Sequence, residues 1–530
     1  MIDLLELRRG RGFCVRSGPA RVALLHHGFR TTQMGASDRR QADYAPRYAS
    51  LGLLNLARSA EVDHDNGDLP FRPEFRYFDE DSFEDDAALA AAIETWLRPA
   101  PARFVFAGLY SLAVDRTAEM LGRLDATNIC IVAGGAHPTV SPGIDFVHLV
   151  VRGEGGAAVR HILSKLLEPG FGEGPDARAI SFELGGRRTD GRTTFDRSLA
   201  TIAAPAFAYD LCDAGTSNCR ERWWKAVGER TQIYICTQSC RARCTFCSTY
   251  LIHGKLVSRP VELVAGDLEF LIGELGHDSI QFHDDDLLQH EQLDDLLALL
   301  ARKGIVWTCN ARAEFITPEL AARMHAAGCR KVFLGVESFN QQTLDYFRKG
   351  TTVAMNRRAI VTLDAAGIGV VCGYIIGAPH ETPESILSDF EIALDLPIYF
   401  LAAAILTPDI GTVEFHRAAK RYPLLAELKE KSGMSLRPRP DLFGAEAPFG
   451  LPTVCEGATK KELNELYALI NFEFLNRPAV LERLRRHTLP SRLDEAYSWL
   501  ALQRTKADEL FGATALACVQ SRSPALGMAG

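Results

Sequence analysis

The 530-residue chain lacks features that would place it in a membrane or a secretory pathway. Its longest uncharged runs, 365–379 and 396–408, contain internal Gly or Pro and are shorter than the roughly 18 apolar residues of a spanning helix. The start, MIDLLELRRGRGF, has acidic side chains inside its only apolar stretch, which argues against a signal-peptide core. We therefore expect no membrane span and a cytoplasmic location.

The sequence also lacks any run rich in Lys and Arg, and 67 acidic against 59 basic residues give a formal net charge of −8. This balance disfavours a nucleic-acid partner. An apolar fraction of 47% and ordinary Gly and Pro contents exclude collagen-like and fully disordered chains. At roughly 150 residues per domain, the length predicts three or four structural units.

Short apolar segments alternate with helix-like segments over residues 1–155. The apolar segments are 21–28, 74–81, 103–111, 130–139 and 148–156, and helical periodicity is present at 50–58, 86–97 and 115–124. Strands joined by helix-length connections favour a parallel sheet, and such sheets bind ligands at the carboxyl ends of their strands. This part of the chain is predicted to be a Rossmann-like domain.

A second alternation covers residues 228–420. Expected strands are 231–236, 279–283, 306–311, 331–338, 369–377 and 399–408, with helices at 260–275, 291–303, 318–327 and 383–394. Six such units predict a partial (β/α)6 barrel of the triose-phosphate-isomerase type, which carries its chemistry at the carboxyl ends of the strands. Residues 156–227 are expected to be a linker with a hairpin. Residues 421–530 are expected to be mainly helical, with helices at 460–475 and 491–510 and a frayed tail. The predicted fold class is α/β.

The most specific motif is the triplet Cys240-x-x-x-Cys244-x-x-Cys247, directly after the first expected barrel strand. A four-iron cluster takes one ligand per iron, so three thiolates leave one iron open. An open iron suits a small chelate with one amine and one carboxylate, such as the methionine end of S-adenosylmethionine. A zinc site with His253 as fourth ligand is an alternative interpretation, and a chance grouping of cysteines is another.

The triplet, with Phe246 just before its last cysteine, resembles the radical S-adenosylmethionine superfamily. Downstream segments resemble the branch of that superfamily with an N-terminal cobalamin-binding domain. They are 282–286 (FHDDD), 310–312 (NAR), 335–338 (GVES), 373–379 (GYIIGAP) with Glu381, and 406–412 (LTPDIGT). The resemblance covers roughly residues 20–420.

This resemblance implies roles for individual residues. The 4Fe–4S cluster would be bound by Cys240, Cys244 and Cys247. S-adenosylmethionine would be contacted by Phe246, Glu337, Ser338, Gly373, Ile375 and Gly377, with Asp284, Asp285 and Asp286 near its methionine part or near the substrate. Each of these carboxylates is open to another interpretation, as a solvated or helix-capping acid.

The resemblance also implies cobalamin at the carboxyl ends of the N-terminal strands, in the loops 134–139 and 153–156. Gly134 and Gly135 would admit the ring, Gly153 belongs to the second loop, and Thr139 and Glu154 would hydrogen-bond the amide side arms. Tyr110 and Ser111 are weaker candidates. The Asp-x-His-x-x-Gly signature is absent: 63–67 (DHDNG) has the wrong spacing and His26-His27-Gly28 lacks the aspartate. His137 is expected to fix its loop, and a domain that has lost its cofactor is the alternative.

The implied activity is a cobalamin-dependent radical methyltransferase that acts on an unactivated carbon of a small-molecule or natural-product substrate. An electron donor such as flavodoxin or ferredoxin would be its partner. A radical oxidative cyclase or rearrangement enzyme, in which cobalamin carries electrons or is unused, is the alternative, and a cofactor sensor is a third interpretation. The absence of a second cysteine triplet argues against methylthiolation, and Cys309 and Cys372 are expected to pack within strands.

Overall fold

The chain forms two compact units in the computed structural model. One joins Met1–Glu221, Arg230–Lys303 and Pro408–Leu451, and the other joins Arg222–Glu229, Gly304–Thr407 and Pro452–Gly530. The structure describes residues 5–6, 19–27, 49–110, 114–125, 128–140, 144, 146–151, 153, 155–166, 181–182, 187–189, 192–194, 199, 201–212, 224–422, 453–475 and 477–501.

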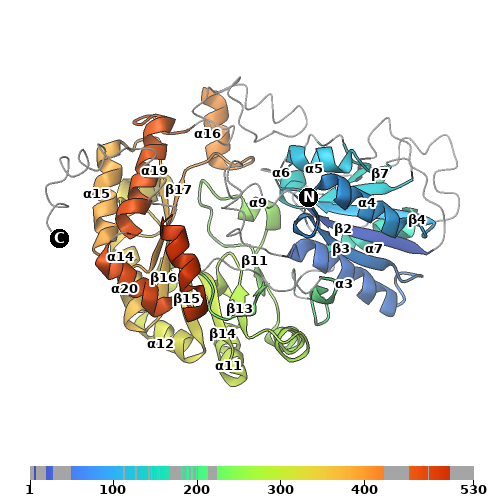
Figure 1. The fold of residues 1–530 in the computed structure, drawn as a ribbon, viewed down its shortest axis with the longest axis horizontal. Helices are drawn as coiled ribbons and strands as arrows, with labels where there is room; N and C mark the ends of the chain where they lie inside the picture. The colour runs from blue at the N-terminus through green and yellow to red at the C-terminus, as the bar shows by residue number, and fades with distance from the viewer. Residues whose placement is uncertain are drawn as a thin grey trace. The chain divides into compact units, whose positions relative to one another are not determined.

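A five-stranded parallel sheet forms the N-terminal part of the first unit (Figure 1). Its strands are β2 (Ala20–His26), β3 (Glu74–Asp79), β4 (Ala102–Gly108), β5 (Cys130–Gly134) and β6 (Leu149–Val150), in the order β3-β2-β4-β5-β6. This is the doubly wound order 2-1-3-4-5, whose ligand crevice lies where the winding reverses, between β2 and β4. The predicted Rossmann-like domain is confirmed.

Helices follow the strands of this sheet. They are α3 (Leu51–Asp65), α4 (Asp86–Leu97), α5 (Val114–Leu121), α6 (Ala136–Val140) and α7 (Gly156–Leu166). Near-continuous apolar strands bury both faces of a parallel sheet. Val105 and Ile131 pack in one core cluster with Ile93 of α4 and Met120 of α5, each at most 1% exposed. This core fixes the strand ends that carry the loops.

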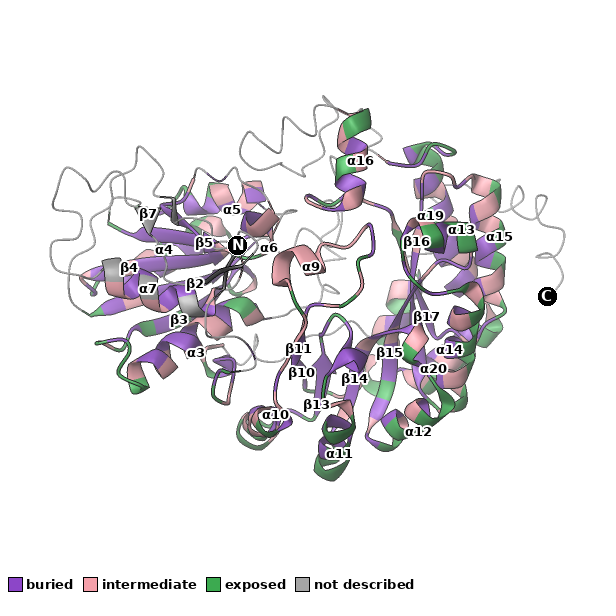
Figure 2. Cartoon of the chain, turned by 180° about the vertical axis from the view of Figure 1, so that it is seen from behind, coloured by how far each residue is buried: buried purple, intermediate pink, exposed green. Residues whose placement is uncertain are grey.

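Six parallel strands make the second sheet, in the order β10-β13-β14-β15-β16-β17. They are β10 (Thr231–Tyr234), β13 (Ser279–Phe282), β14 (Val306–Arg312), β15 (Cys329–Glu337), β16 (Gly369–Ile376) and β17 (Phe400–Ile405). The order follows the sequence, as the predicted partial barrel requires. Figure 2 shows its strands largely buried. Cys309 and Cys372 are buried within strands, so their predicted packing role is confirmed.

The helices of this sheet are α10 (Val261–Leu268), continued by the π-helix η5 (Glu269–Glu274), α11 (Leu293–Lys303), α12 (Pro318–Ala326), α13 (Gln341–Tyr346), α14 (Val353–Ala365), α15 (Pro383–Leu394) and α16 (Val413–Arg421). Four of them begin after a threonine whose hydroxyl accepts a hydrogen bond from the first turn. These N-caps are Thr317, Thr352, Thr382 and Thr412.

The remaining elements are short ladders, single turns and C-terminal helices. The ladders are β1 (Leu5–Glu6) with β7 (Ser181–Phe182), β8 (Arg187–Thr189) with β9 (Arg192–Thr194), and β11 (Thr237–Gln238) with β12 (Val257–Ser258). The helices are α9 (Thr249–His253), α19 (Lys460–Leu475) and α20 (Pro478–His487). Turns of 3-10 helix are η1 (Glu80–Ser82), η4 (Tyr209–Leu211), η6 (Leu287–Gln289), η7 (Ala313–Phe315) and η8 (Pro490–Arg492).

The structure differs from the sequence expectations in one segment that was assigned to a linker. Residues 156–166 form α7, an amphipathic helix that follows β6 and packs against α3. The expected hairpin is present as β8 and β9. Residues 423–452, and the tail that was expected to be frayed, lie outside the described residues. Among the helices that the structure describes, none has the length and apolar character needed to cross a membrane.

Candidate functional site

The three cysteines of the triplet lie on one loop that leaves and rejoins the barrel. After β10, residues 235–258 form an excursion whose base is the β11–β12 ladder. Ser239 has a φ of +75°, so the chain turns sharply just before Cys240. The Ser239 hydroxyl donates a hydrogen bond to the Gly254 carbonyl at 2.8 Å, which joins the two sides of the excursion. We call residues 235–258 the cluster loop.

Hydrogen-bond donors surround the first cysteine. The Gln289 side-chain amide donates to the Cys240 sulfur at 3.1 Å, and the Ala242 N–H donates to the same sulfur at 3.4 Å. The N–H of Cys247 donates to the carbonyl of Cys244 at 3.2 Å, so these two cysteines share one turn. Donors directed at sulfur stabilise the thiolates that hold an iron–sulfur cluster.

In the part of the chain that the structure describes, the three cysteines are not arranged with other side chains around a single metal ion. Among the described residues, no group of three or more His, Cys, Asp or Glu side chains could hold a metal ion. A 4Fe–4S cluster binds each cysteine at a different iron, so its ligands stand farther apart than the ligands of one ion. His253, the expected fourth zinc ligand, instead has its Nδ1 at 2.9 Å from the Gln238 amide.

The acidic residues after β13 accept hydrogen bonds from the cluster loop. Asp284, 1% exposed, accepts hydrogen bonds from the backbone N–H groups of Cys236, at 3.0 Å, and of Thr237. Burial raises the pKa of Asp284 to about 7. Asp285 is exposed and accepts a hydrogen bond from the Thr249 hydroxyl at 2.9 Å.

Asp286 acts as a helix cap, which was the alternative interpretation of these carboxylates. It accepts hydrogen bonds from the Leu288 N–H at 3.2 Å and from the Gln289 amide at 2.9 Å. Gln289 also accepts from the Arg241 N–H at 3.0 Å. Asp286 therefore orients the amide that donates to Cys240.

In the second unit, the end of β15 holds a mostly buried ion pair, with the Lys349 side chain 5% exposed and the Glu337 side chain 12% exposed. Glu337 has a φ of +68° at a register shift against β16, and its Oε1 lies 2.9 Å from Nζ of Lys349. A Cβ at Gly335 would approach both groups within 2.8 Å, and one at Gly373 would lie 3.5 Å from Oε2 of Glu337. Glycine at position 335 therefore leaves room for the pair, whereas the contact at Gly373 is an ordinary van der Waals distance.

Ser338 follows and makes a second buried contact. Its hydroxyl donates to Oδ2 of Asp389 at 2.9 Å, and the Tyr374 hydroxyl donates to the same oxygen at 3.0 Å. Burial raises the pKa of Asp389 to about 6 despite these donors. The Ser338 hydroxyl therefore holds the turn after β15 against β16 and α15.

The motif after β16 is a turn held by Glu381. Gly377 has a φ of +95°, and the Glu381 carboxylate accepts the N–H groups of Gly377 at 2.7 Å and Ala378 at 3.0 Å. The Thr343 hydroxyl donates to Glu381 at 2.8 Å. Gly373 is buried and Ile375 half-buried on β16, so the expected residues of this strand lie at its carboxyl half.

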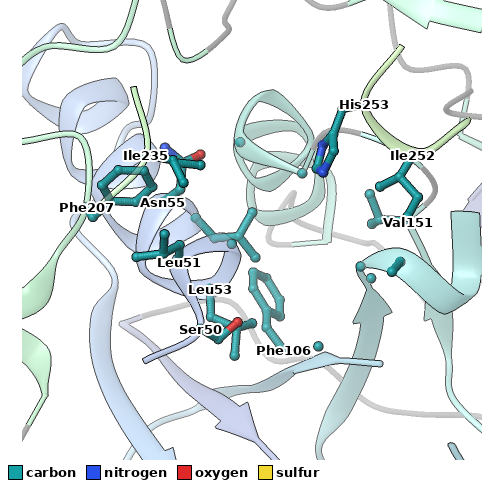
Figure 3. A pocket seen from close by; sticks show the side chains of 18 of the residues that line it. Ser50, Leu51, Leu53, Asn55, Phe106, Val151, Phe207, Ile235, Ile252 and His253 are labelled. Atoms are coloured by element: carbon teal, nitrogen blue, oxygen red, sulfur yellow. The ribbon is translucent and has the colours of Figure 1, made fainter. Parts of the chain in front are cut away.

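A pocket of about 460 Å³ opens at the carboxyl ends of the N-terminal sheet (Figure 3). This volume is within the usual range of small-molecule sites. One wall is apolar and comes from α3, β4 and the end of β6, with Leu51, Leu53, Phe106 and Val151. Phe207, Ile235, Ile252 and His253 line the pocket from the linker and the cluster loop.

Glycine backbone forms another part of the pocket wall. Gly134, Gly135 and Gly153 all line it. Gly135 has a φ of +101°, and a Cβ there would lie 3.3 Å from the Leu109 carbonyl oxygen. The Thr139 hydroxyl donates to the Gly135 carbonyl at 2.8 Å and accepts the Gly153 N–H at 2.9 Å, so it ties the two expected loops together.

The other residues expected at this pocket have different environments in the structure. His137 is fully buried and donates its N–H to the Leu109 carbonyl at 3.2 Å, while Tyr110 lines the pocket. Glu154 and Ser111 lie outside the described residues. Phe246 is half-buried on the cluster loop.

One residue of the pocket lining, His26, belongs to a polar pair that the sequence did not reveal. Nδ1 of His26, at the end of β2, lies 2.9 Å from Oδ2 of Asp79, its register partner on β3, and both are buried. The His26-His27-Gly28 motif lacks an aspartate in sequence, but the sheet supplies one. Ser50 also lines the pocket, and its backbone N–H donates to the Tyr77 hydroxyl at 2.8 Å.

Comparison with known proteins places the central part of the chain. Residues 234–393 match the radical SAM superfamily. An uncharacterised methyltransferase of Pyrococcus horikoshii is 28% identical over 298 residues, which are 54% of this chain and 62% of that protein. An anaerobic magnesium-protoporphyrin IX monomethyl ester cyclase of Cereibacter sphaeroides is 25% identical over 320 residues, 57% of this chain and 49% of that protein. The chain thus spans about half to three fifths of these curated relatives.

Two solved structures share the fold. The cobalamin-dependent S-adenosylmethionine radical enzyme OxsB, with aqua-cobalamin bound, has a TM-score of 0.59 at 13% identity and covers 93% of this chain and 72% of that one. The radical S-adenosylmethionine methyltransferase TsrM of Kitasatospora setae, with cobalamin and a [4Fe-4S] cluster, has a TM-score of 0.56 at 15% identity and covers 76% of this chain and 75% of that one. Residues 234–393 are thus similar to the radical SAM superfamily, and the chain shares the fold of these two structures.

Proposed function

We propose that the protein is a cobalamin-dependent radical S-adenosylmethionine methyltransferase that methylates an unactivated carbon of a small molecule. The observation that carries this proposal is the shared pocket. Gly134 and Gly135 of the N-terminal sheet and Ile252 and His253 of the cluster loop line one cavity within one compact unit. A corrinoid held by the sheet would therefore face the loop that holds the cluster, and a substrate between them would meet both.

The chain's own residues bind and orient in this proposal. Cys240, Cys244 and Cys247 would hold the cluster, and the carboxyl ends of β15 and β16 would receive S-adenosylmethionine. Glycine backbone and apolar side chains would hold the cobalamin. The cofactors supply reductive cleavage of S-adenosylmethionine and methyl transfer, while the protein supplies position and exclusion of water.

The Thr139 bridge and the Asp286–Gln289 contact would act through other groups. Thr139 fixes the spacing between the glycine loops, and Gln289 donates to a cluster ligand. Both are positioning residues, because neither is placed to react.

An oxidative cyclase is the second candidate, favoured by the 25% identity to the magnesium-protoporphyrin cyclase. That relative and the Pyrococcus methyltransferase match similar shares of the chain. Radical initiation at the cluster would be the same in both cases, and the use of cobalamin would differ.

The test needs no knowledge of the substrate. The protein is reconstituted without oxygen with iron, sulfide and hydroxocobalamin, then given S-adenosylmethionine and a strong reductant. A methyltransferase should form both 5′-deoxyadenosine and S-adenosylhomocysteine, because reduced cobalamin takes a methyl group even without substrate. Formation of 5′-deoxyadenosine alone would favour the cyclase, and formation of neither would refute both.

The matched controls are two cysteine variants. Cys244→Ala should abolish 5′-deoxyadenosine formation. Cys309→Ala, which removes an equally buried thiol from β14, should leave it within about twofold of the wild type, because free buried cysteines act as small apolar residues.

A further inference from the structure

Gln289, the last residue of η6, brings a side-chain amide against the cluster loop at two neighbouring residues. Its Nε2 donates to the sulfur of Cys240 at 3.1 Å, and its Oε1 accepts the N–H of Arg241 at 3.0 Å. Gln289 is 6% exposed, so water competes little for these contacts. A side chain that follows the second barrel strand thus contacts a cysteine that follows the first.

The contacts of this amide determine which way round it lies. A backbone N–H only donates, so the contact with Arg241 requires the amide oxygen. An ionised carboxylate only accepts, so the contact with Oδ2 of Asp286, at 2.9 Å, requires the NH2 group. Turned over, the amide would put its oxygen beside the carboxylate and its NH2 group beside an N–H. The orientation that directs an N–H at Cys240 is therefore the one in which every contact joins a donor to an acceptor.

Asp286, which holds the amide in this orientation, is itself fixed. It is fully buried at the start of η6, where its Oδ1 accepts the N–H of Leu288 at 3.2 Å and its backbone carbonyl accepts the N–H of Gln289 at 3.2 Å. Both residues thus belong to one short turn after β13. The carboxylate cannot shift without moving the turn that carries Gln289. Asp286 and Gln289 therefore act as one unit, which we call the Asp286–Gln289 pair.

A hydrogen bond to a ligand sulfur changes how readily an iron–sulfur cluster is reduced. The reduction potential of a cluster depends on hydrogen bonds to its sulfurs, among other factors. Reduction adds negative charge, part of which lies on the sulfurs, so a donor at sulfur stabilises the reduced state more than the oxidised state. The N–H of Ala242 also donates to Cys240, at 3.4 Å, but this backbone donor is present whatever the side chain. Gln289 supplies a side-chain donor, and that contact depends on the sequence.

We infer that the Asp286–Gln289 pair makes the cluster easier to reduce, with Gln289 as the donor and Asp286 as the residue that orients it. The inference rests on the proposed function, because it needs a cluster on the three cysteines. Both are positioning residues, since they act through Cys240. For Asp286 this is a different role from the contact with S-adenosylmethionine or the substrate that the sequence resemblance implied.

The test is a redox titration of the protein reconstituted with iron and sulfide. Dithionite supplies the electrons, each cluster takes up one, and electron paramagnetic resonance measures the reduced fraction at each potential. Gln289→Leu removes the donor and should lower the equilibrium constant for one-electron reduction about tenfold, which lowers the potential by about 59 mV. Gln292→Leu is the matched control. The Gln292 amide accepts the N–H of Val261 at 3.1 Å, outside the cluster loop, so its loss should leave the potential unchanged.

A second substitution tests the orienting role of Asp286. Asp286→Asn replaces an acceptor oxygen with an NH2 group, so Gln289 is no longer held with its N–H toward Cys240. Loss of the carboxylate charge shifts the potential by itself, so the comparison is made within this variant. Adding Gln289→Leu to Asp286→Asn should change the equilibrium constant by less than about twofold, because the donor has already been lost. An effect of about tenfold in this background, as in the wild type, would show that Asp286 does not orient the amide.

Pulsed electron paramagnetic resonance keeps the test decisive if a variant fails to bind its cluster. Wild-type protein with ¹⁵N in its glutamine side chains should show coupling between the reduced cluster and the amide nitrogen of Gln289, and Gln292→Leu should retain this coupling. Absence of the coupling, or equal potentials in the wild type and Gln289→Leu, would overturn the inference and leave the proposed function standing. A wild-type protein that forms no cluster would overturn both.

Discussion

At the carboxyl edge of the N-terminal sheet, the pocket is lined mostly by apolar side chains and glycine backbone, whereas the end of β15 carries a buried ion pair. Leu51, Phe106 and Gly135 represent the first region, and Glu337 with Lys349 the second. Both regions lie where parallel strands end, so the fold does not explain their different chemistry.

The difference indicates two kinds of ligand. Apolar walls, and glycine backbone that lets a ligand approach closely, recognise the ligand by its shape. Such a pocket suits a large ring. A buried ion pair costs desolvation energy, and replacing it with apolar groups would often be neutral or stabilising. Keeping such a pair beside Gly335 and Gly373 suits recognition of a small charged ligand, which agrees with S-adenosylmethionine in the proposed function.

Breaking the ion pair should have the largest effect. Lys349→Met leaves the Glu337 carboxylate buried without its cation and should lower the free energy of unfolding by about 3–5 kcal/mol. Denaturant unfolding measures this loss. The double variant Lys349→Met/Glu337→Gln should regain much of it.

An exposed pair of the same unit supplies the control. Arg486 and Glu482 pair at 3.2 Å with side chains 60% and 74% exposed, so Glu482→Gln should cause no measurable change. If Lys349→Met lowered the free energy of unfolding as little as Glu482→Gln does, the Glu337–Lys349 pair would not be shielded from water.

An intermediate effect is expected at Ser338, and it should depend on pH. Ser338→Ala removes a hydrogen bond to Asp389, whose pKa burial raises from 3.8 to about 6. At pH 8 the buried carboxylate is charged, and the loss should be about 1.5–3 kcal/mol. At pH 5 it is largely protonated, and the loss should be about 1 kcal/mol.

The raised pKa of Asp389 also determines how the stability of the wild type changes with pH. Because folding raises this pKa, the folded state binds more protons than the unfolded state between about pH 4 and 6, so the stability contributed by Asp389 falls as the pH rises through that window. Ser385→Ala, which removes a neutral capping contact with Thr382, should cost the same at both pH values. If Ser338→Ala lowered the free energy of unfolding equally at pH 5 and pH 8, the result would contradict the raised pKa of Asp389.

The smallest change in stability is expected at two glycines with positive φ, one in the pocket and one outside it. Gly135→Ala and Gly67→Ala both place a side chain at positive φ, at a cost of about 1–2 kcal/mol each. Only Gly135 lines the pocket, so only Gly135→Ala should weaken cobalamin retention, by about tenfold, as measured by the corrinoid that remains after gel filtration. Iron content should stay unchanged in both, and equal retention would argue that this wall does not bind the corrinoid.

Both sheets could be predicted from the sequence because their strands are short, nearly continuous apolar runs. Helix α7 was missed because its small residues after Gly156 gave a weak signal beside the polar segment that follows. Helix α14, which begins after the N-cap Thr352, was also not predicted from the sequence.

Site residues, too, were predictable only where they lie close together in the sequence. The three cysteines could be singled out as candidate ligands because they lie within one short loop. The pairs His26–Asp79 and Glu337–Lys349 could not, because each depends on strand register or on a loop returning to a strand end. Likewise, the contact of Ser338 with Asp389 joins residues on different elements.

The central claim is that three cysteines hold a cluster whose fourth iron is open to S-adenosylmethionine. The most direct measurement is the electron paramagnetic resonance spectrum of the reduced, reconstituted protein with and without S-adenosylmethionine. The account predicts about four irons per chain and a spectrum that shifts when S-adenosylmethionine is added. A cluster signal that S-adenosylmethionine leaves unchanged, or a protein that binds zinc in place of iron, would contradict it.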